Sequence, residues 1–258
     1  MPDESKSMSE AALLDVRGIG KRFGDFVAVD DVSLRIEPHT VHSVIGPNGA
    51  GKTTLFHVLT GVLPPSSGDI LFKNSSMVGV PPHRRLAAGI SRAFQISSAF
   101  RELSVRENVW LAVRGAKVRL DALHGGFDNR RIDERTESLM AEFGLRARAA
   151  DLAGALPHGQ QRSLEFAMTM ASEPDLVLLD EPTAGVGPDD IPRFTSLIRK
   201  IGSERSVVLV EHNMSIVMGV SDRITVLARG KVLASGTAAE IKSDPHVRAA
   251  YLGERHHA

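Results

Sequence analysis

The chain has no cysteine among its 258 residues. Disulfides, thiolate catalysis and cysteine-based zinc sites are therefore excluded, as in many proteins of a reducing compartment. An excess of one charge is also lacking, because 31 lysines and arginines balance 31 aspartates and glutamates. No overall field attracts nucleic acid or anionic lipid, so we expect no nucleic-acid partner.

Long apolar runs are absent as well. Apolar runs such as those at 176–179 and 207–210 have the length of buried strands and fall short of the roughly 20 residues that cross a bilayer. Residues 1–12 are mainly polar and lack the apolar core of a signal peptide, so we expect a disordered tail and no secretion by that route. The remaining composition, with 42% hydrophobic and 24% charged residues, is that of an ordinary globular protein.

The first part of the chain predicts a phosphate-binding unit. Residues 13–19 and 26–36 have the alternating or β-branched pattern of a small antiparallel sheet. Residues 41–45 form an apolar strand that leads into a glycine-rich turn, and a helix follows over 52–60 until Gly61 ends it. A strand, a glycine loop and a helix in this order make up a phosphate-binding βα unit.

The middle of the chain is predicted to be helical, and strand character returns after it. A capping box at 104–107 opens one helix of this region. Apolar strands at 176–179 and 207–210 then flank a helix that Gly202 is expected to end. Strands and helices that alternate in this way indicate an α/β fold with a mostly parallel sheet. A second capping box, at 237–240, opens a C-terminal helical segment.

The segment GPNGAGKTT satisfies the G-x-x-x-x-G-K-[ST] phosphate-loop pattern. Its glycines let backbone N–H groups turn inward around phosphate oxygens, and the next helix directs its positive end at the same anion. Lys52 is expected to neutralise β- and γ-phosphate charge, and Thr53 to bind Mg²⁺. A chance glycine-rich turn is the alternative, and the flanking strand and helix argue against it. The expected nucleotide-binding residues of the loop are Gly46, Pro47, Asn48, Gly49, Ala50, Gly51, Lys52, Thr53 and Thr54.

Two carboxylates follow the apolar strand at 176–179. Ligands of open α/β sheets lie beyond the carboxyl ends of the strands, so Asp180 and Glu181 are expected to face the phosphate site. Asp180 suits the Mg²⁺ shell, and Glu181 can orient or deprotonate an attacking water. Standing alone, the pair would indicate only a solvated turn before Pro182.

A further segment, LPHGQQRSLEFAM, carries Gly159 and Gln160 at the start of a predicted helix. A helix N-terminus attracts anions. Since one phosphate loop already serves one nucleotide, this end is expected to reach a nucleotide on another copy of the chain. The alternative is that it binds only its own cap, as most helix N-termini do.

Together these segments resemble the nucleotide-binding subunit of ABC transporters, over residues 13–258. The resemblance implies a P-loop NTPase (RecA-like) fold with a mostly parallel sheet core, an N-terminal antiparallel β subdomain and an inserted helical subdomain. It also implies a head-to-tail dimer that holds ATP between the phosphate loop of one copy and the LPHGQ signature of the other. The implied parts are a core at 13–96 and 166–235, a helical subdomain at 97–165 and a C-terminal helical segment at 236–258. The motifs that carry the likeness are the phosphate loop, Gln95 in SRAFQ, LPHGQ, LVLLDEP and His212 in VLVEH.

The resemblance assigns roles to three more residues. Phe23, in KRFGD, falls where the family stacks an aromatic ring on adenine, and local packing in a turn is the alternative. Gln95 falls where the family's glutamine senses Mg²⁺ and the γ-phosphate, and His212 where its histidine contacts that phosphate. ATP and Mg²⁺ are thus the implied cofactors. The implied catalytic residues are Glu181, His212 and Gln95, and the implied metal ligands are Thr53, Gln95 and Asp180.

Two departures from the family pattern stand out. The usual signature is LSGGQ, whereas Pro157 and His158 replace its serine and first glycine here. The serine hydroxyl contact to the opposing phosphate is therefore absent, and Gly159 must supply backbone N–H groups instead. Gly187 stands where the family often has an aspartate, which puts communication across the dimer through that carboxylate in doubt.

The chain looks most like the ATPases of branched-chain amino acid importers, in its GQQR signature, in GISRAFQISSAFRELSVRENV and in the ending SDPHVRAAYLGE. The segment between 113 and 135 and the YLGE tail favour the first of their two ATPases. The implied partners are a second ATPase subunit, identical or different, two transmembrane permease subunits and, indirectly, an external solute-binding protein. The chain would then lie peripherally at the cytoplasmic face of the membrane. Urea or amide importers and the lipopolysaccharide-export ATPase are close alternatives, and the chain itself does not specify the solute.

Two other classes of protein are less consistent with the sequence. A soluble ABC ATPase of repair or translation usually carries two cassettes or a long coiled-coil insertion, which this chain lacks. A phosphate-loop kinase of small metabolites would act as a monomer and would leave LPHGQ and His212 unexplained. Transport is therefore favoured, and a helix of a membrane partner is expected to dock at 97–110. The small apolar surface expected there, for which ordinary packing is the alternative, consists of Ser97, Ala99, Phe100 and Leu103.

Overall fold

Two β-sheets with helices around them make up the protein. The computed structural model describes residues 12–93, 99–121 and 129–252. The larger sheet has the strand order β10-β9-β3-β8-β7-β6 and the smaller one the order β2-β1-β4-β5. Most of the predicted tail at 1–12 lies outside the described ranges, and so do Gln95 and Ser97.

The smaller sheet is antiparallel throughout, which confirms the prediction for 13–19 and 26–36. A turn of two residues joins its first two strands, and Phe23 pairs with Phe26 across that turn. Gly24 in the turn has a φ of +58°, a backbone conformation that glycine adopts without steric cost. The strands are β1 (Leu14–Phe23), β2 (Phe26–Ile36), β4 (Ser67–Phe72) and β5 (Ser75–Ser76).

The larger sheet is parallel except for its last strand, as the sequence pattern predicted. The exception, β10, forms an antiparallel hairpin with β9. The strands are β3 (Val41–Ile45), β6 (Ile90–Ala93), β7 (Leu176–Asp180), β8 (Ser206–Val210), β9 (Arg223–Ala228) and β10 (Lys231–Gly236).

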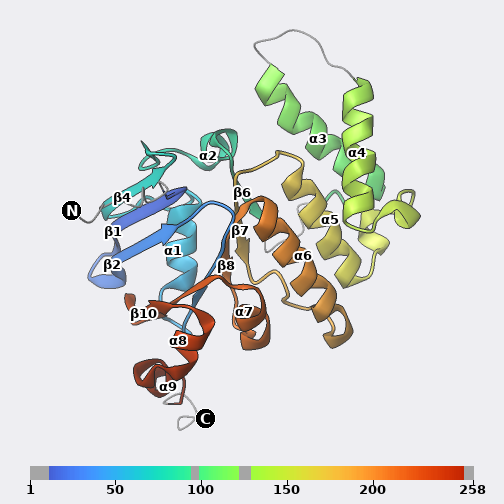
Figure 1. Cartoon of the computed structure of the whole chain (residues 1–258). Helices are drawn as coiled ribbons and strands as arrows, with labels where there is room; N and C mark the ends of the chain where they lie inside the picture. The colour runs from blue at the N-terminus through green and yellow to red at the C-terminus, as the bar shows by residue number, and fades with distance from the viewer. Residues whose placement is uncertain (1–11, 94–98, 122–128, 253–258) are drawn as a thin grey trace, which may run out of the picture.

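The helices connect these strands and cover both faces of the larger sheet (Figure 1). Both predicted capping boxes are present, since Ser104 and Glu107 bond reciprocally, as do Thr237 and Glu240. The α-helices are α1 (Lys52–Leu59), α2 (Pro82–Ala88), α3 (Val105–Asp121), α4 (Asn129–Glu142), α5 (His158–Met170), α6 (Ile191–Glu204), α7 (Met214–Val220), α8 (Ala238–Ser243) and α9 (Pro245–Leu252). The 3₁₀ turns are η1 (Arg146–Arg148), η2 (Ala153–Ala155) and η3 (Pro188–Asp190).

Alternate residues of β7 belong to two different hydrophobic cores. On β7, Leu176 and Leu178 pack with α1 and the smaller sheet, whereas Val177 and Leu179 pack with helices α3 to α6. The strands of the larger sheet are apolar on both faces because each face is covered. As a result the sheet separates α1 from α5, which pack on opposite faces (Figure 1).

Gly202 does not end its helix, contrary to the sequence-based expectation. Helix α6 continues to Glu204. A Cβ at position 202 would collide with the Cγ2 atom of Val41. The glycine therefore allows α6 to approach strand β3 closely, a packing role that the sequence pattern does not distinguish from a helix stop.

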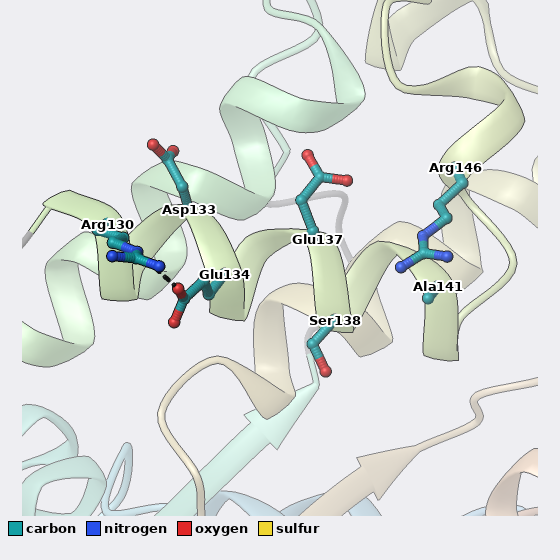
Figure 2. Close-up of a pocket in the computed structure, with 7 residues that line it drawn as sticks. All are labelled: Arg130, Asp133, Glu134, Glu137, Ser138, Ala141 and Arg146. Atoms are coloured by element: carbon teal, nitrogen blue, oxygen red, sulfur yellow. Dashed lines mark hydrogen bonds and ion pairs between the residues drawn. The ribbon is translucent and has the colours of Figure 1, made fainter.

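The outward face of α4 is strongly charged. Figure 2 shows Asp133, Glu134 and Glu137 along this face, around a shallow depression that Arg146 borders. Arg106 of α3 lies 2.9 Å from Glu137, and such exposed pairs contribute little to stability. No helix within 12–93, 99–121 and 129–252 is long and apolar enough to span a bilayer.

Candidate functional site

The ends of three neighbouring strands bring the predicted chemical groups to one edge of the larger sheet. Strands β3, β8 and β7 are adjacent and parallel, with Asp180 in register with Val210. Their carboxyl ends therefore lie side by side. Gly46 follows β3, Glu181 follows β7, and Glu211 follows β8.

The phosphate loop folds around the ammonium group of Lys52. The Nζ atom donates to the carbonyl oxygens of Gly46, at 2.6 Å, and of Pro47, at 2.9 Å. Gly51, just before α1, has a φ of +97°, and a Cβ there would collide with the carbonyl oxygen of Ala28. The loop thus depends on glycine for both its conformation and its contact with β2.

Asp180, the last residue of β7, is a buried carboxylate. It is 4% exposed, and its Oδ2 atom has no hydrogen-bond partner among the residues that the structure describes. Burial raises the pKa of Asp180 above its ordinary value, the charge of Glu181 raises it further, and Arg92 and Lys52 act in the opposite direction. Asp180 ends β7 at the same sheet edge where the phosphate loop follows β3.

These groups fit a hard divalent cation. Mg²⁺ prefers oxygen ligands and commonly binds one or two carboxylates together with substrate phosphates. An unpaired, buried carboxylate oxygen costs free energy that a cation would recover. Thr53, exposed in the first turn of α1, can contribute a hydroxyl oxygen. Gln95, the third predicted ligand, lies outside the described residues.

Glu181 and His212 meet at the exits of β7 and β8. The Nδ1 atom of His212 lies 3.7 Å from Oε1 of Glu181. The φ of Glu181 is +47°, a left-handed conformation that is strained for a residue with a side chain. Its backbone N–H donates to the carbonyl oxygen of Val210 at 2.8 Å, which anchors this strained residue to β8. Both side chains are partly open to solvent.

Glu211 is a buried residue of the site that sequence reasoning missed. Its Oε1 atom accepts from the backbone N–H of Thr183 at 3.1 Å and from the Thr183 hydroxyl. Its Oε2 atom accepts from the backbone N–H groups of His212 at 3.0 Å and Asn213 at 3.1 Å. The available signal was its position: a carboxylate directly after a buried strand, as at the end of β7.

The signature residues lie elsewhere in the fold. Gly159 and Gln160 are in the first turn of α5, which packs on the opposite face of the sheet from α1 and Lys52. The Oε1 atom of Gln160 is buried without a hydrogen-bond partner in the described part of the chain. The cap residue, Pro157, makes no side-chain cap. Within one copy of the chain, the phosphate loop and the LPHGQ signature therefore do not lie at the same site.

Phe23 lies at the tip of the hairpin between β1 and β2. It is 48% exposed, and Lys21 Nζ lies 5.1 Å from the ring centroid. Phe26, opposite it, is 66% exposed. Strand β2 of this hairpin also carries Ala28, whose carbonyl oxygen lies so close to Gly51 that it would collide with a Cβ there. The hairpin therefore packs against the phosphate loop.

A half-enclosed groove runs between α2 and β6 on one side and α3 and α5 on the other. Of the predicted docking residues that the structure describes, Ala99, Phe100 and Leu103 do not line it. Phe100 is nevertheless 59% exposed. Among the residues that line the groove are Leu86, Arg92, Leu111, Ala112, Glu165 and Met168.

The chain is similar to known transport proteins over nearly its whole length. A family model described as ABC transporter matches residues 29–184, and one described as branched-chain amino acid ATP-binding cassette transporter matches residues 231–257. The high-affinity branched-chain amino acid transport ATP-binding protein LivG of Escherichia coli K12 is 38% identical over 251 residues, covering 94% of this chain and 98% of that protein. The protein of the same description from Pseudomonas aeruginosa, BraF, is 39% identical with the same coverage.

A second group of relatives is described by a different function. The lipopolysaccharide export system ATP-binding protein LptB of Escherichia coli K12 is 34% identical over 246 residues, with 94% of this chain and 98% of that protein covered. Among solved structures, the ADP conformation of an ATP-binding cassette of an ABC transporter superposes with a TM-score of 0.83 at 27% identity, covering 94% of this chain and 99% of that one. A nucleotide-free cassette gives a TM-score of 0.80 at 29% identity, covering 93% and 98%.

Proposed function

The chain belongs to the ATP-binding subunits of ABC transporters and is an ATPase, and from that premise we propose that it powers the import of branched-chain amino acids. Two matches support this solute class. Residues 231–257 match the family model of branched-chain amino acid transporters, and almost the whole chain matches ATP-binding proteins of branched-chain amino acid transport. Its substrate is ATP, and solute selectivity resides in partner subunits.

We propose that the phosphate loop and β7 together hold Mg·ATP. The backbone of residues 46–51 and Lys52 bind the phosphates, and Phe23 contacts the adenine. Thr53, Asp180 and Gln95 bind the metal, and the orphan oxygen of Asp180 supports this assignment. Bound Mg²⁺ would neutralise charge on the phosphates, as in other phosphate-loop enzymes.

In the hydrolytic step, Glu181 orients and deprotonates the water that attacks the γ-phosphorus, while the bond from that phosphorus to the β,γ-bridging oxygen breaks, so that ADP and inorganic phosphate are formed. Its carboxylate is partly open to solvent and lies within 3.7 Å of the His212 ring. His212 contacts the γ-phosphate and stabilises the charge that develops on it. The strained backbone at Glu181 supports a functional role, because such conformations cluster at active sites.

The functional unit is a head-to-tail dimer. Gly159 and Gln160 lie on the other face of the sheet from Lys52, so a second cassette, identical or different, must present its signature to the bound ATP. Since Pro157 and His158 replace the usual serine and glycine, backbone N–H groups of α5 make this contact. ATP closes the dimer and hydrolysis opens it again.

Coupling to transport requires two transmembrane permease subunits, with the chain at the cytoplasmic face of the membrane. A helix of each permease subunit would enter the groove between α2 and α5, whose lining includes Leu111 and Met168. This replaces the docking surface expected from the sequence at Ala99, Phe100 and Leu103, which do not line the groove. An external solute-binding protein acts through the permease subunits.

The test is to purify the chain with its membrane partners, reconstitute the complex and measure ATP hydrolysis while solutes are supplied with their binding protein. Leucine, isoleucine or valine should stimulate hydrolysis, whereas urea and short amides should not. Stimulation by urea or amides alone would refute the amino acid assignment. The rate should rise more steeply than linearly with cassette concentration in the isolated chain, and a strictly linear rise would refute the dimer.

A second function deserves the same test because LptB relatives cover the chain equally well. If the complex extracts lipopolysaccharide from vesicles and ignores amino acids, the chain is an export ATPase.

A further inference from the structure

The carboxylate of Glu211 connects two loops that carry reacting groups. One loop follows Glu181 and contains Thr183, and the other carries His212. Glu211 is buried, and each of its two oxygens accepts two hydrogen bonds, one pair from each loop. We propose that Glu211 is a positioning residue that sets the distance between Glu181 and His212.

The hydrogen-bond pattern matches a carboxylate and no other side chain of this size. An ionised carboxylate is an acceptor only, with room for about four hydrogen bonds. All four partners here are donors: three backbone N–H groups and the hydroxyl of Thr183. A carboxamide would have to direct its NH₂ group at one of the two donor pairs, where backbone N–H groups cannot turn to accept. Charge-assisted bonds of this kind also hold geometry more firmly than neutral ones.

The connection acts on the reacting groups over short distances. Thr183 is two residues beyond Glu181, and Glu181 is itself bonded through its N–H to Val210, the residue before Glu211. Oε2 of Glu211 lies 4.0 Å from Nδ1 of His212, the atom that is 3.7 Å from Glu181. Releasing either loop from Glu211 would therefore change how Glu181 and His212 approach each other without touching the phosphate loop.

The inference rests on the proposed roles of Glu181 and His212 in hydrolysis. Two substitutions test it, each releasing a different part of the connection. Glu211→Gln leaves one donor pair without an acceptor, and Thr183→Val removes only the hydroxyl bond. Thr183→Ser retains the hydroxyl and serves as the conservative rescue. Thr136→Val is a matched control, because Thr136 is buried and its hydroxyl bonds a carbonyl within α4, far from the site.

The full chain, purified with its membrane partners, is assayed for turnover at saturating Mg·ATP and for ATP affinity by calorimetric titration. For Glu211→Gln we expect kcat to fall about 10- to 100-fold while ATP affinity changes less than about threefold, since a misplacement of about 1 Å can cost that much rate. Thr183→Val should lower kcat about threefold to tenfold, and Thr183→Ser should restore most of it. The double variant should be no slower than Glu211→Gln alone, because both changes break the same connection.

Three outcomes would overturn the inference. These are unchanged kcat in both Glu211→Gln and Thr183→Val, loss of ATP affinity in parallel with rate, or an equal loss of kcat in Thr136→Val. Glu181→Gln is assayed alongside to separate the two levels of the argument. If Glu181→Gln retains turnover, the proposed catalytic role of Glu181 fails; if its turnover collapses while Glu211→Gln and Thr183→Val work normally, only the role of Glu211 fails.

Discussion

The exits of β7 and β8 are alike in sequence and opposite in hydrogen bonding. Each strand is a buried, mainly apolar run with a buried carboxylate at its exit: Asp180 is the last residue of β7, and Glu211 is the first residue after β8. Both oxygens of Glu211 are satisfied by donors from the chain. One oxygen of Asp180 has no such donor within the described residues.

This difference separates a carboxylate whose hydrogen bonds the chain itself satisfies from one whose free oxygen the proposed metal would occupy. A buried acceptor without a partner costs free energy, so a fold retains it only where something else supplies that partner. A fully satisfied buried carboxylate holds its surroundings in one arrangement. Burial alone would have classed the two residues together.

The sharpest test of the β7 exit is Glu181→Gln. We expect turnover to fall by about 10²- to 10⁴-fold, the usual range for losing a general base. ATP binding should persist, and a cassette dimer should accumulate with ATP bound. Turnover is measured by phosphate release and the dimer by light scattering. Turnover within a few-fold of the unsubstituted protein would remove Glu181 from the role of base.

Asp180→Asn should separate the metal from the nucleotide. With the anionic ligand gone, we expect half-maximal turnover to require about 10- to 100-fold more Mg²⁺, the typical cost of weakening a charged contact by 1.5–3 kcal/mol. Glu211→Gln, at the β8 exit, should leave the Mg²⁺ requirement unchanged. Mg²⁺ titrations of turnover decide the point, and equal shifts in the two variants would contradict the contrast between the exits.

Asp180→Asn and Glu211→Gln should rank in the opposite order when stability is measured without nucleotide or metal, with Glu211→Gln showing the larger effect. Glu211→Gln leaves buried donors unpaired and is expected to lower the free energy of unfolding by about 1–3 kcal/mol. Asp180→Asn removes an unpaired buried charge and should cost nothing or stabilise the chain slightly. Urea unfolding of both variants provides the measurement. A greater loss in Asp180→Asn would show that its carboxylate is already satisfied.

The smallest expected effect is a pH dependence. Because burial raises the pKa of Asp180, the folded chain holds that proton more tightly than the unfolded chain. The contribution of this group to stability is thus present at pH values below the unfolded pKa and is lost as pH rises through the folded pKa. The stability advantage of Asp180→Asn should therefore grow as pH rises from about 4, the ordinary Asp value.

His42, elsewhere in the core, contributes a pH dependence of stability with the opposite sign, because its pKa is lowered. Burial lowers the pKa of His42 from 6.5 to about 4, so its contribution is full above pH 6.5 and is lost as pH falls toward 4. Asp180→Asn and the unsubstituted chain both contain His42. Its contribution to stability therefore cancels when the two proteins are compared. An advantage that stays flat with pH would mean that the pKa of Asp180 is the same in the folded and unfolded states.

Much of the fold could be predicted because the apolar pattern encodes it directly. The buried runs that became β3, β7 and β8 were evident, and their carboxyl ends predicted where Asp180 and Glu181 would lie. Gly202 was misjudged because a glycine can end a helix or admit a close neighbour, and only the packing against Val41 distinguishes these roles.

The site was harder to complete from sequence, because hydrogen-bond partners come from distant segments. Nothing near Glu211 in sequence indicates that Thr183, 28 residues earlier, would donate to it. Likewise, the pairing of Phe23 with Phe26 needed the strand register. The functional roles of Gly159 and Gln160 stay predictions, since they depend on a second cassette.

The left-handed backbone of Glu181 has a consequence for how this protein could change over time. Glycine would occupy the same φ of +47° without the steric cost that a side chain incurs, roughly 1–2 kcal/mol. A selection for heat resistance alone would thus favour Glu181→Gly and so discard the proposed base. Thermal stability and turnover therefore favour different residues at position 181. Only selection for ATP-driven uptake would retain the strained glutamate.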